Sequence, residues 1–201
     1  MLNFQEGVVS QYVAKGADKS KIIVGIPFYG QTFTTRGSGT GYGTPSRGPG
    51  VPGAATKQPG MLSYHEICSN LKRGWMLGGD LGNGPFAGDS DNHQWAGFDS
   101  PESVRAKAEF VKRMGYGGVS LSTLDLDDFN NLCCLGASPL LGAAAEVLLG
   151  TQPAPAGCGR PTPPVTPTPK PAASTEPWDD GSSRRTSSTT QKTTTTRDGN
   201  L

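Results

Sequence analysis

Three aspartates within four residues, Asp125, Asp127 and Asp128, are the densest group of side chains in this chain that could do chemistry. Paired carboxylates can serve as general acid and base, and grouped carboxylates bind hard cations such as Mg²⁺. Aspartate is also favoured in turns and caps, where its oxygens accept backbone hydrogen bonds. The residue types alone therefore leave catalysis, metal binding and a structural role open.

Other residues with chemical potential are sparse. The chain has two histidines, His65 and His93, and neither has a third ligand at metal-binding spacing. The glycine-rich residues 37–43 imitate a phosphate-binding loop, but the flanking strand and helix of such a loop are missing. A flexible loop is the better interpretation. We expect neither a metal nor an organic cofactor.

The four cysteines, Cys68, Cys133, Cys134 and Cys158, lack the C-x-x-C spacing of zinc and redox sites. An even number of widely separated cysteines suits disulfides and therefore an oxidising compartment, with free thiols as the alternative. The first residues contain no signal-peptide core. A secreted protein would thus need an N-terminus that begins before Met1.

Charge and hydropathy exclude two classes of partner. The 201 residues carry a formal net charge of +1, so no bulk electrostatic attraction acts toward nucleic acid or an anionic membrane surface. No apolar run is long enough to span a bilayer. We therefore expect no nucleic acid and no membrane among the partners.

The aspartates must be positioned by the segment before them. Residues 119–124 alternate between two faces as a strand does, and Ser100 followed by Pro101 is typical of a helix start. The buried face of that helix is predicted to contain Val104, Ala108, Phe110, Val111 and Met114. A helix followed by a strand that ends in carboxylates is the order of the last unit of a (β/α)₈ barrel.

A second unit precedes this one. Asn3 is expected to cap a helix that Gly16 ends, and residues 22–30 follow as a strand that is apolar on both faces, as a parallel strand covered on both sides would be. Residues 139–149 predict another short, apolar helix after the aspartates. The chain thus has helices and strands in the alternating order of an α/β fold.

Residues 31–97 interrupt this order. So long a connection in a compact domain indicates an inserted α+β subdomain. Within it, residues 36–53 are a predicted loop and residues 61–71 a predicted helix. For Trp75 and Trp95, packing in the core of the subdomain is favoured over the alternative that they line a cleft. Residues 151–201 are rich in proline, threonine and serine, and we expect them to be a disordered linker.

Several motifs occur in one order along the chain. They are residues 21–30 (KIIVGIPFYG), 60–68 (GMLSYHEIC), 94–99 (QWAGFD), 117–118 (GG), 124–129 (LDLDDF) and 139–141 (PLL). Together they closely resemble the C-terminal part of animal family 18 glycoside hydrolases, the chitinases and chitinase-like lectins. The resemblance covers about residues 2–149.

The resemblance implies a specific architecture. Residues 22–28 and 119–124 would be the last two strands of an incomplete (β/α)₈ TIM barrel, within a domain of residues 1–150. Residues 31–97 would be the α+β insertion domain that forms one wall of the sugar cleft. Because two parallel strands cannot close a barrel, we expect the insertion domain to fold best and the barrel strands to be under-buried.

The family's acid motif, Asp-x-x-Asp-x-Asp-x-Glu, occurs nowhere in the 201 residues. In this family the glutamate protonates the glycosidic oxygen while the substrate's acetamide group attacks, an exception to the usual two-carboxylate scheme. Since a positioned acid supplies roughly 10²–10⁴-fold in rate, we assign no catalytic residue and expect the chain alone to be inactive. The resemblance makes the three aspartates a structural motif at the strand exit.

The resemblance also implies positions that contact sugar. Tyr29 and Met61 match family contacts, whereas Gln31 stands where many members have a cation and Gln58 where some have glutamate. Ser122 replaces the tryptophan floor of the cleft, and an aromatic plane there would pack against a sugar ring. The loss of that tryptophan should weaken sugar binding.

Three functional hypotheses follow from the resemblance. The first is a fragment of a secreted chitinase or chitinase-like protein, and the second is a non-catalytic protein that binds chitin or chitooligosaccharides. The third is a product without function of its own, or one that acts only through a partner supplying the other strands.

The resemblance also pairs Cys68 with Cys133. Cys134 is additional, and either pairs with Cys158 or remains a free thiol.

Overall fold

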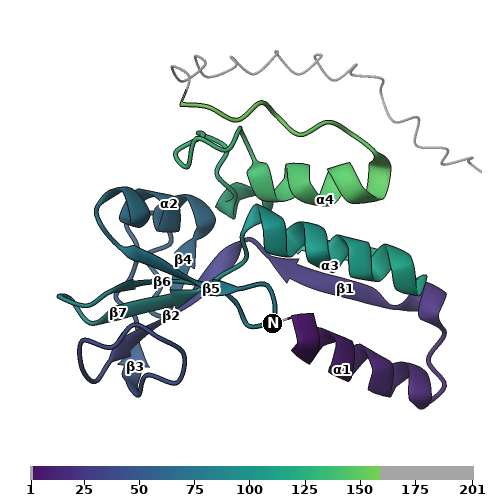
Figure 1. Ribbon diagram of the computed structural model, residues 1–201, viewed down its shortest axis with the longest axis horizontal. Coiled ribbons are helices and arrows are strands. Elements are labelled where there is room, and N and C mark those ends of the chain that lie inside the picture. Colours follow the sequence, from purple (N-terminus) through teal and green to yellow (C-terminus); the bar gives the residue numbers. More distant parts are fainter. Residues whose placement is uncertain (1, 159–201) are drawn as a thin grey trace, which may run out of the picture. The chain divides into compact units, whose positions relative to one another are not determined.

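The computed structural model describes residues 2–158, with side chains from residue 6 onward (Figure 1). The helices are α1 (Leu2–Ala14), α2 (Tyr64–Lys72), α3 (Pro101–Met114) and α4 (Pro139–Leu149). The strands are β1 (Ile23–Pro27), β2 (Tyr29–Thr35), β3 (Ser46–Pro49), β4 (Met61–Ser63), β5 (Met76–Asp80), β6 (Gly84–Asp89), β7 (Gln94–Gly97) and β8 (Gly118–Ser122). The expectations for the linker beyond residue 158 lie outside the described residues.

The strands form two sheets. β1 and β8 pair in parallel, with Val24 opposite Val119 and Ile26 opposite Leu121. The other six strands form an antiparallel sheet in the order β3-β2-β7-β6-β5, and β4 pairs with the same edge of β2 as β3 does. The chain is therefore a mixed α/β structure, as the order of predicted elements indicated.

The predicted strand 22–30 is in fact two strands that separate at Phe28. Pro27 has no N–H to extend the ladder, and the side chain of Phe28 is fully buried. The Phe28 N–H donates to the carbonyl of Ser122 at 2.7 Å, and its carbonyl accepts from the N–H of Tyr64 at 3.1 Å. From Tyr29 onward the chain pairs with antiparallel partners. The larger sheet therefore begins two residues before the predicted start of the inserted subdomain at residue 31.

The two helices nearest the aspartates follow the sequence expectations. The Ser100 hydroxyl caps α3, Gly115 ends it in a left-handed conformation, and Val104, Ala108, Phe110 and Val111 are buried. α4 has the expected bounds and lies beside α3, where Arg105 and Glu146 form an ion pair at 2.7 Å (Figure 1). The local cap and helical periodicity predicted α3, and the apolar run of residues 139–149 predicted α4.

Other expectations need correction. α1 begins at Leu2, so Asn3 lies inside it and does not cap it. Residues 61–63 are strand β4 before the helix starts, and β3 forms inside the predicted loop. The predicted strand 119–124 ends at Ser122, and Leu124 belongs to a short 3-10 turn. These strands are short and depend on distant partners, which sequence periodicity does not reveal.

The parallel pair is buried on one face only. Val24 and Ile26 share one face of β1 and are 5% and 1% exposed. Ile23 lies on the opposite face and is 54% exposed. Ser120 and Ser122 are exposed on the same side. The expectation of a strand covered on both faces is therefore wrong for the described residues, and the expected under-burial of this pair is observed. No helix in residues 2–158 is long and apolar enough to cross a membrane.

Candidate functional site

Strand β2 brings three of the five predicted contact positions together. Tyr29 and Gln31 point to the same side because alternate residues of a strand share a face, and Met61 on β4 stands directly opposite Gln31. Gly30 lies between them on the inner face, where a Cβ would come within 2.7 Å of Cδ1 of Ile67. Close packing against α2 thus holds this part of β2 with its outer face open.

The loop that contains Gln58 is anchored through Glu66. Glu66 Oε1 accepts the N–H groups of Ala55 at 2.6 Å and Thr56 at 3.3 Å, while Oε2 accepts the N–H and the hydroxyl of Ser63, both at 3.0 Å. Burial favours a higher pKa for the Glu66 carboxyl, but the hydrogen bonds from Ser63, Ala55 and Thr56 outweigh it and lower the pKa. Gln58 itself is exposed, and its carbonyl accepts the N–H of Met61 at 3.4 Å.

Ser122 ends β8 beside the point where β1 passes into β2. It is exposed and stands opposite Pro27, and its carbonyl accepts the N–H of the next residue, the buried Phe28. The peptide bond from Ser122 to Thr123 is cis. Through the hydrogen bond to Phe28, Ser122 lies beside the residue before Tyr29, but it belongs to the parallel pair and not to the sheet that carries Tyr29, Gln31 and Met61.

The three aspartates do not form a reactive group. Asp127 and Asp128 are fully buried, whereas Asp125 is exposed. Asp127 accepts the N–H groups of Leu140 at 3.3 Å and Leu141 at 2.9 Å, and so caps α4, where Ser138 provides no side-chain cap. Burial raises the pKa of Asp127.

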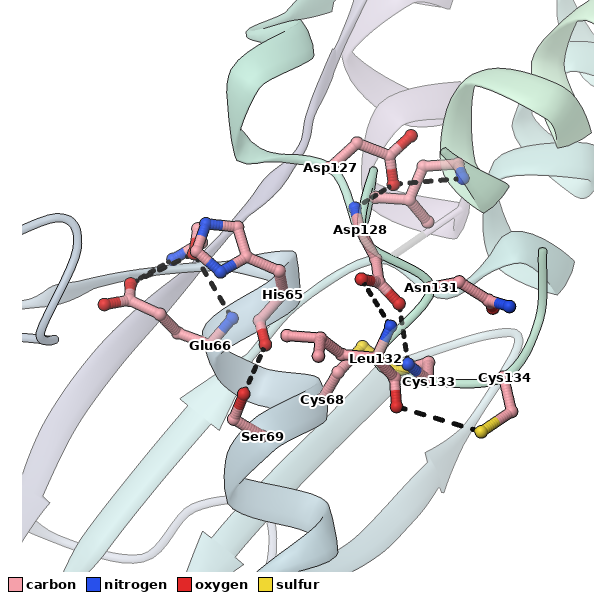
Figure 2. Close-up of a disulfide and its surroundings, with 12 residues drawn as sticks. His65, Glu66, Cys68, Ser69, Asp127, Asp128, Asn131, Leu132, Cys133 and Cys134 are labelled. Atoms are coloured by element: carbon pink, nitrogen blue, oxygen red, sulfur yellow. Dashed lines mark hydrogen bonds between the residues drawn. A yellow bond between two sulfur atoms is a disulfide. The ribbon is translucent and has the colours of Figure 1, made fainter. Parts of the chain in front are cut away.

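The oxygens of Asp128 accept the N–H groups of Leu132 at 2.8 Å and Cys133 at 2.6 Å (Figure 2). The structural interpretation of the aspartates therefore applies to both buried members. Their oxygens are occupied by backbone donors and do not face an open site.

Two disulfides hold the segment after β8. Cys68 on α2 pairs with Cys133, as the resemblance implied, and links the helix of the larger sheet to the region of the aspartates (Figure 2). Cys134 pairs with Cys158, which resolves the alternative of free thiols. Gly157 also donates to the Cys134 carbonyl at 2.8 Å, so residues 151–158 return to the folded part. The expected linker therefore begins with an anchored stretch.

Metal binding gains no support within residues 2–158. The one group of three ligand-type residues with atoms in mutual reach is Cys68, Asp128 and Cys133. The sulfurs of Cys68 and Cys133 form a disulfide with each other, so neither is available as a thiolate ligand. His65 packs edge-on against Phe129 at 5.8 Å, and His93 lies in the turn before β7.

Two aromatic residues continue the outer face of β2: Phe33, which no sequence pattern singled out, and Trp95, for which lining a cleft was the less favoured interpretation. Phe33 shares this face with Tyr29 and Gln31, and Trp95 on β7 stands opposite Phe33. Trp95 is half-buried on the sheet surface and is not part of the main core, whereas Trp75 packs against that core. The alternation of Tyr29, Gln31 and Phe33 was the available signal, but a prediction for Trp95 also required the register of β7.

These features coincide with a known class of protein. The chain belongs to glycosyl hydrolases family 18, whose family model matches residues 2–127. It is 44% identical over 163 residues to Probable chitinase 10 of Drosophila melanogaster, an alignment that covers 77% of this chain and 7% of that protein. The resemblance inferred from the motifs is confirmed.

Solved structures show the same fold. Catalytic domain 2 of the Ostrinia furnacalis Group II chitinase matches with a TM-score of 0.68 and 42% identity, over 75% of this chain and 40% of that one. Human YKL-39, described as a pseudo-chitinase with retained chitooligosaccharide binding properties, matches with a TM-score of 0.66 and 36% identity, over 73% and 40%. This chain spans less than half the length of these relatives.

Proposed function

We propose that residues 2–158 are the wall of a chitooligosaccharide-binding cleft. In this proposal β1 and β8, with α3 and α4, are the last two units of an incomplete (β/α)₈ barrel, and the antiparallel sheet with α2 is the α+β insertion domain. The parallel pairing of β1 with β8 and the right order of helices support the barrel assignment. The match to about two fifths of a chitinase catalytic domain supports the same assignment.

One observation carries the binding proposal: Tyr29, Gln31 and Met61 lie side by side on the open face of the larger sheet. A tyrosine ring can pack against the C–H face of a pyranose, while a glutamine amide can both donate to and accept from sugar hydroxyls. Human YKL-39, one of the relatives, is described as a pseudo-chitinase with retained chitooligosaccharide binding properties. Binding without cleavage therefore has a precedent in the family.

Hydrolysis by this chain alone is not part of the proposal. Its 201 residues contain no Asp-x-x-Asp-x-Asp-x-Glu motif, and the buried Asp127 and Asp128 are engaged by backbone donors. Two disulfides within residues 2–158 require an oxidising compartment, so we place the protein outside the cell.

The second candidate is one wall of a chitinase whose acid is supplied by other strands. The exposed face of the parallel pair, with Ile23 on it, favours this candidate, because such a face is normally covered. Both candidates predict the same result in a chromogenic chitobioside assay of this chain alone, because its 201 residues contain no acid motif. The oxidised 201-residue chain should show no turnover above buffer, and turnover would refute the binding-only proposal.

The binding proposal is tested by isothermal titration with chitooligosaccharides. Tyr29→Ala should weaken binding by roughly 3- to 10-fold, since an aromatic contact contributes about 0.5–1.5 kcal/mol. Tyr12→Ala is the matched control, because Tyr12 is an exposed tyrosine on α1, away from the sheet. Equal affinities of the two variants, or no binding by the wild-type chain, would contradict the proposal.

A further inference from the structure

The open face of the larger sheet continues beyond the proposed contacts as a row of aromatic rings. Phe33 follows Gln31 on the same face of β2, and its ring centroid lies 6.1 Å from that of Trp95. The ring of Phe86 on β6 stacks on Trp95 at 5.8 Å with an interplanar angle of 23°. Figure 1 shows β2, β7 and β6 as neighbouring strands, so these rings span the sheet.

Glycines opposite these rings make the surface flat. A Cβ at Gly97 would lie 2.7 Å from Cη2 of Trp95, and a Cβ at Gly78 would lie 2.5 Å from Cζ of Phe86. The rings therefore lie across positions where another residue would place a side chain. An aromatic surface that lies along a sheet leaves its plane available to a flat ligand.

A pocket of about 260 Å³ opens on this surface. Phe33 and Trp95 form its floor, and the loop before β3 contributes Tyr42, whose ring meets Phe86 edge-on at 4.9 Å. The Tyr42 hydroxyl donates to the carbonyl of Gly84, which ties the loop to the start of β6. The pocket is smaller than the roughly 300–1,000 Å³ typical of sites for drug-sized ligands, so its size suits a single ring.

The polar groups of the pocket are neutral. Its lining contains no charged side chain and includes the hydroxyls of Thr35, Thr44 and Ser46. Each of these hydroxyls donates to a nearby carbonyl, of Gly37, Gly41 and Gly48 respectively. The Ser46 hydroxyl also accepts the N–H of Gly48 at 3.1 Å, and the remaining lone pairs of the three hydroxyls can accept hydrogen bonds from a ligand. An aromatic floor with hydroxyl acceptors at the rim suits a neutral sugar ring with one apolar face and several O–H donors.

We propose that this pocket, lined by Phe33, Tyr42 and Trp95, is an additional subsite for one sugar ring of a chitooligosaccharide. The inference rests on the proposed function, because the pocket continues the row of Tyr29 and Gln31. With a rise of about 3.4 Å per residue, Phe33 lies roughly 7 Å beyond Gln31 and roughly 14 Å beyond Tyr29. A disaccharide at Tyr29 does not extend to the pocket, whereas a longer oligomer does.

The test compares two probes, di-N-acetylchitobiose and hexa-N-acetylchitohexaose, by titration of the oxidised 201-residue chain. The wild-type chain should bind the hexamer more tightly than the dimer. Tyr42→Ala and Phe33→Ser should each lower hexamer affinity by roughly 3- to 10-fold and leave dimer affinity within about twofold. Ser46→Arg, at an exposed rim position, should have the same length-dependent effect by filling the pocket. Tyr12→Ala is the control and should change neither affinity.

The outcomes separate this inference from the proposed function. If all variants bind the hexamer as the wild type does while Tyr29→Ala is impaired, the subsite is refuted and the proposed function stands. If the wild-type chain binds neither probe, both are overturned. Because no charge lines the pocket, the preference for the hexamer should persist at high salt. A preference that disappears with salt would also refute the subsite.

Discussion

The substitution Glu66→Gln offers a direct test of how the loop with Gln58 is held. The Glu66 side chain is 8% exposed, and its two oxygens serve different partners. Oε1 accepts from Ala55 and Thr56 in the loop, and Oε2 accepts from Ser63 at the start of α2. Glutamine has one carbonyl oxygen and one NH₂ group. In the variant, either the N–H groups of Ala55 and Thr56 or the donors of Ser63 must therefore face the NH₂ group, which is itself a donor.

The size of the effect follows from these bonds. Hydrogen bonds to a charged group contribute about 1.5–3 kcal/mol each, and they are not additive when they share an acceptor. We expect the loop to lose about 2 kcal/mol or more of its stability against local opening. Protection of the Ala55 and Thr56 amides against hydrogen exchange should then fall by about 30-fold, because about 1.4 kcal/mol corresponds to a factor of ten.

The sign of the pH dependence follows from the lowered pKa of Glu66. A group whose pKa is lower in the folded state contributes stability above its unfolded pKa, here 4.5, and this stability is lost as pH falls through the folded pKa. After correction for intrinsic exchange rates, protection of the two amides in the wild type should therefore decrease below about pH 4.5. In Glu66→Gln it should be low and independent of pH.

Glu109→Gln is the matched control, since Glu109 is exposed on α3 and far from the loop in the fold. It should leave the exchange of Ala55 and Thr56 unchanged. The reasoning would be refuted if Glu66→Gln showed wild-type protection, or if its protection still decreased on acidification. Either result would mean that other contacts hold the loop.

Three further predictions concern other parts of the chain. Ser122→Trp should tighten chitooligosaccharide binding by roughly 2- to 10-fold in titration, because it supplies an aromatic plane at an exposed position, whereas an unchanged affinity would contradict a role for this position. Asp127→Ala should lower the free energy of unfolding in urea by about 1–2 kcal/mol, since it removes the cap of α4, and an unaltered midpoint would contradict the capping role. Replacement of Cys68 and Cys133 by serine should lower the free energy of unfolding by about 4 kcal/mol, because the disulfide closes a separation of 65 residues. Replacement of Cys134 and Cys158, with a separation of 24 residues, should lower it by about 3 kcal/mol. In thermal unfolding, the Cys68–Cys133 variant should therefore have the lower midpoint.

Local signals in the sequence predicted the elements that depend on neighbouring residues. The start and buried face of α3 were readable because its cap and helical periodicity act within one or two turns, and the apolar run of residues 139–149 indicated α4. The division of residues 22–30 at Phe28 was not readable. It depends on the carbonyl of Ser122 and the N–H of Tyr64, which are distant in sequence.

The candidate site was predicted in the same uneven way. The resemblance supplied Tyr29, Gln31 and Met61 one by one, but their adjacency depends on the register between β2 and β4. Trp95 was assigned to a core because a tryptophan is usually buried. On β7 it lies instead on the outer face, where Gly97 leaves space for its ring. Composition gives no information about which face a residue occupies until the register is known.

The aspartates show why residue type alone does not define a site. Asp127 and Asp128 are adjacent carboxylates of the kind that could form a catalytic pair. However, backbone N–H groups from α4 and from residues 132–133 donate to their oxygens. Tyr29, Gln31 and Phe33 include no carboxyl group, yet their face of β2 is open. When backbone N–H groups already donate to both oxygens of a carboxylate, its role is to hold the chain in place. An open surface of aromatic and amide groups, by contrast, remains free to contact a ligand. In the described residues, the two buried aspartates therefore hold the segment after β8, whereas the proposed recognition involves the open face of β2.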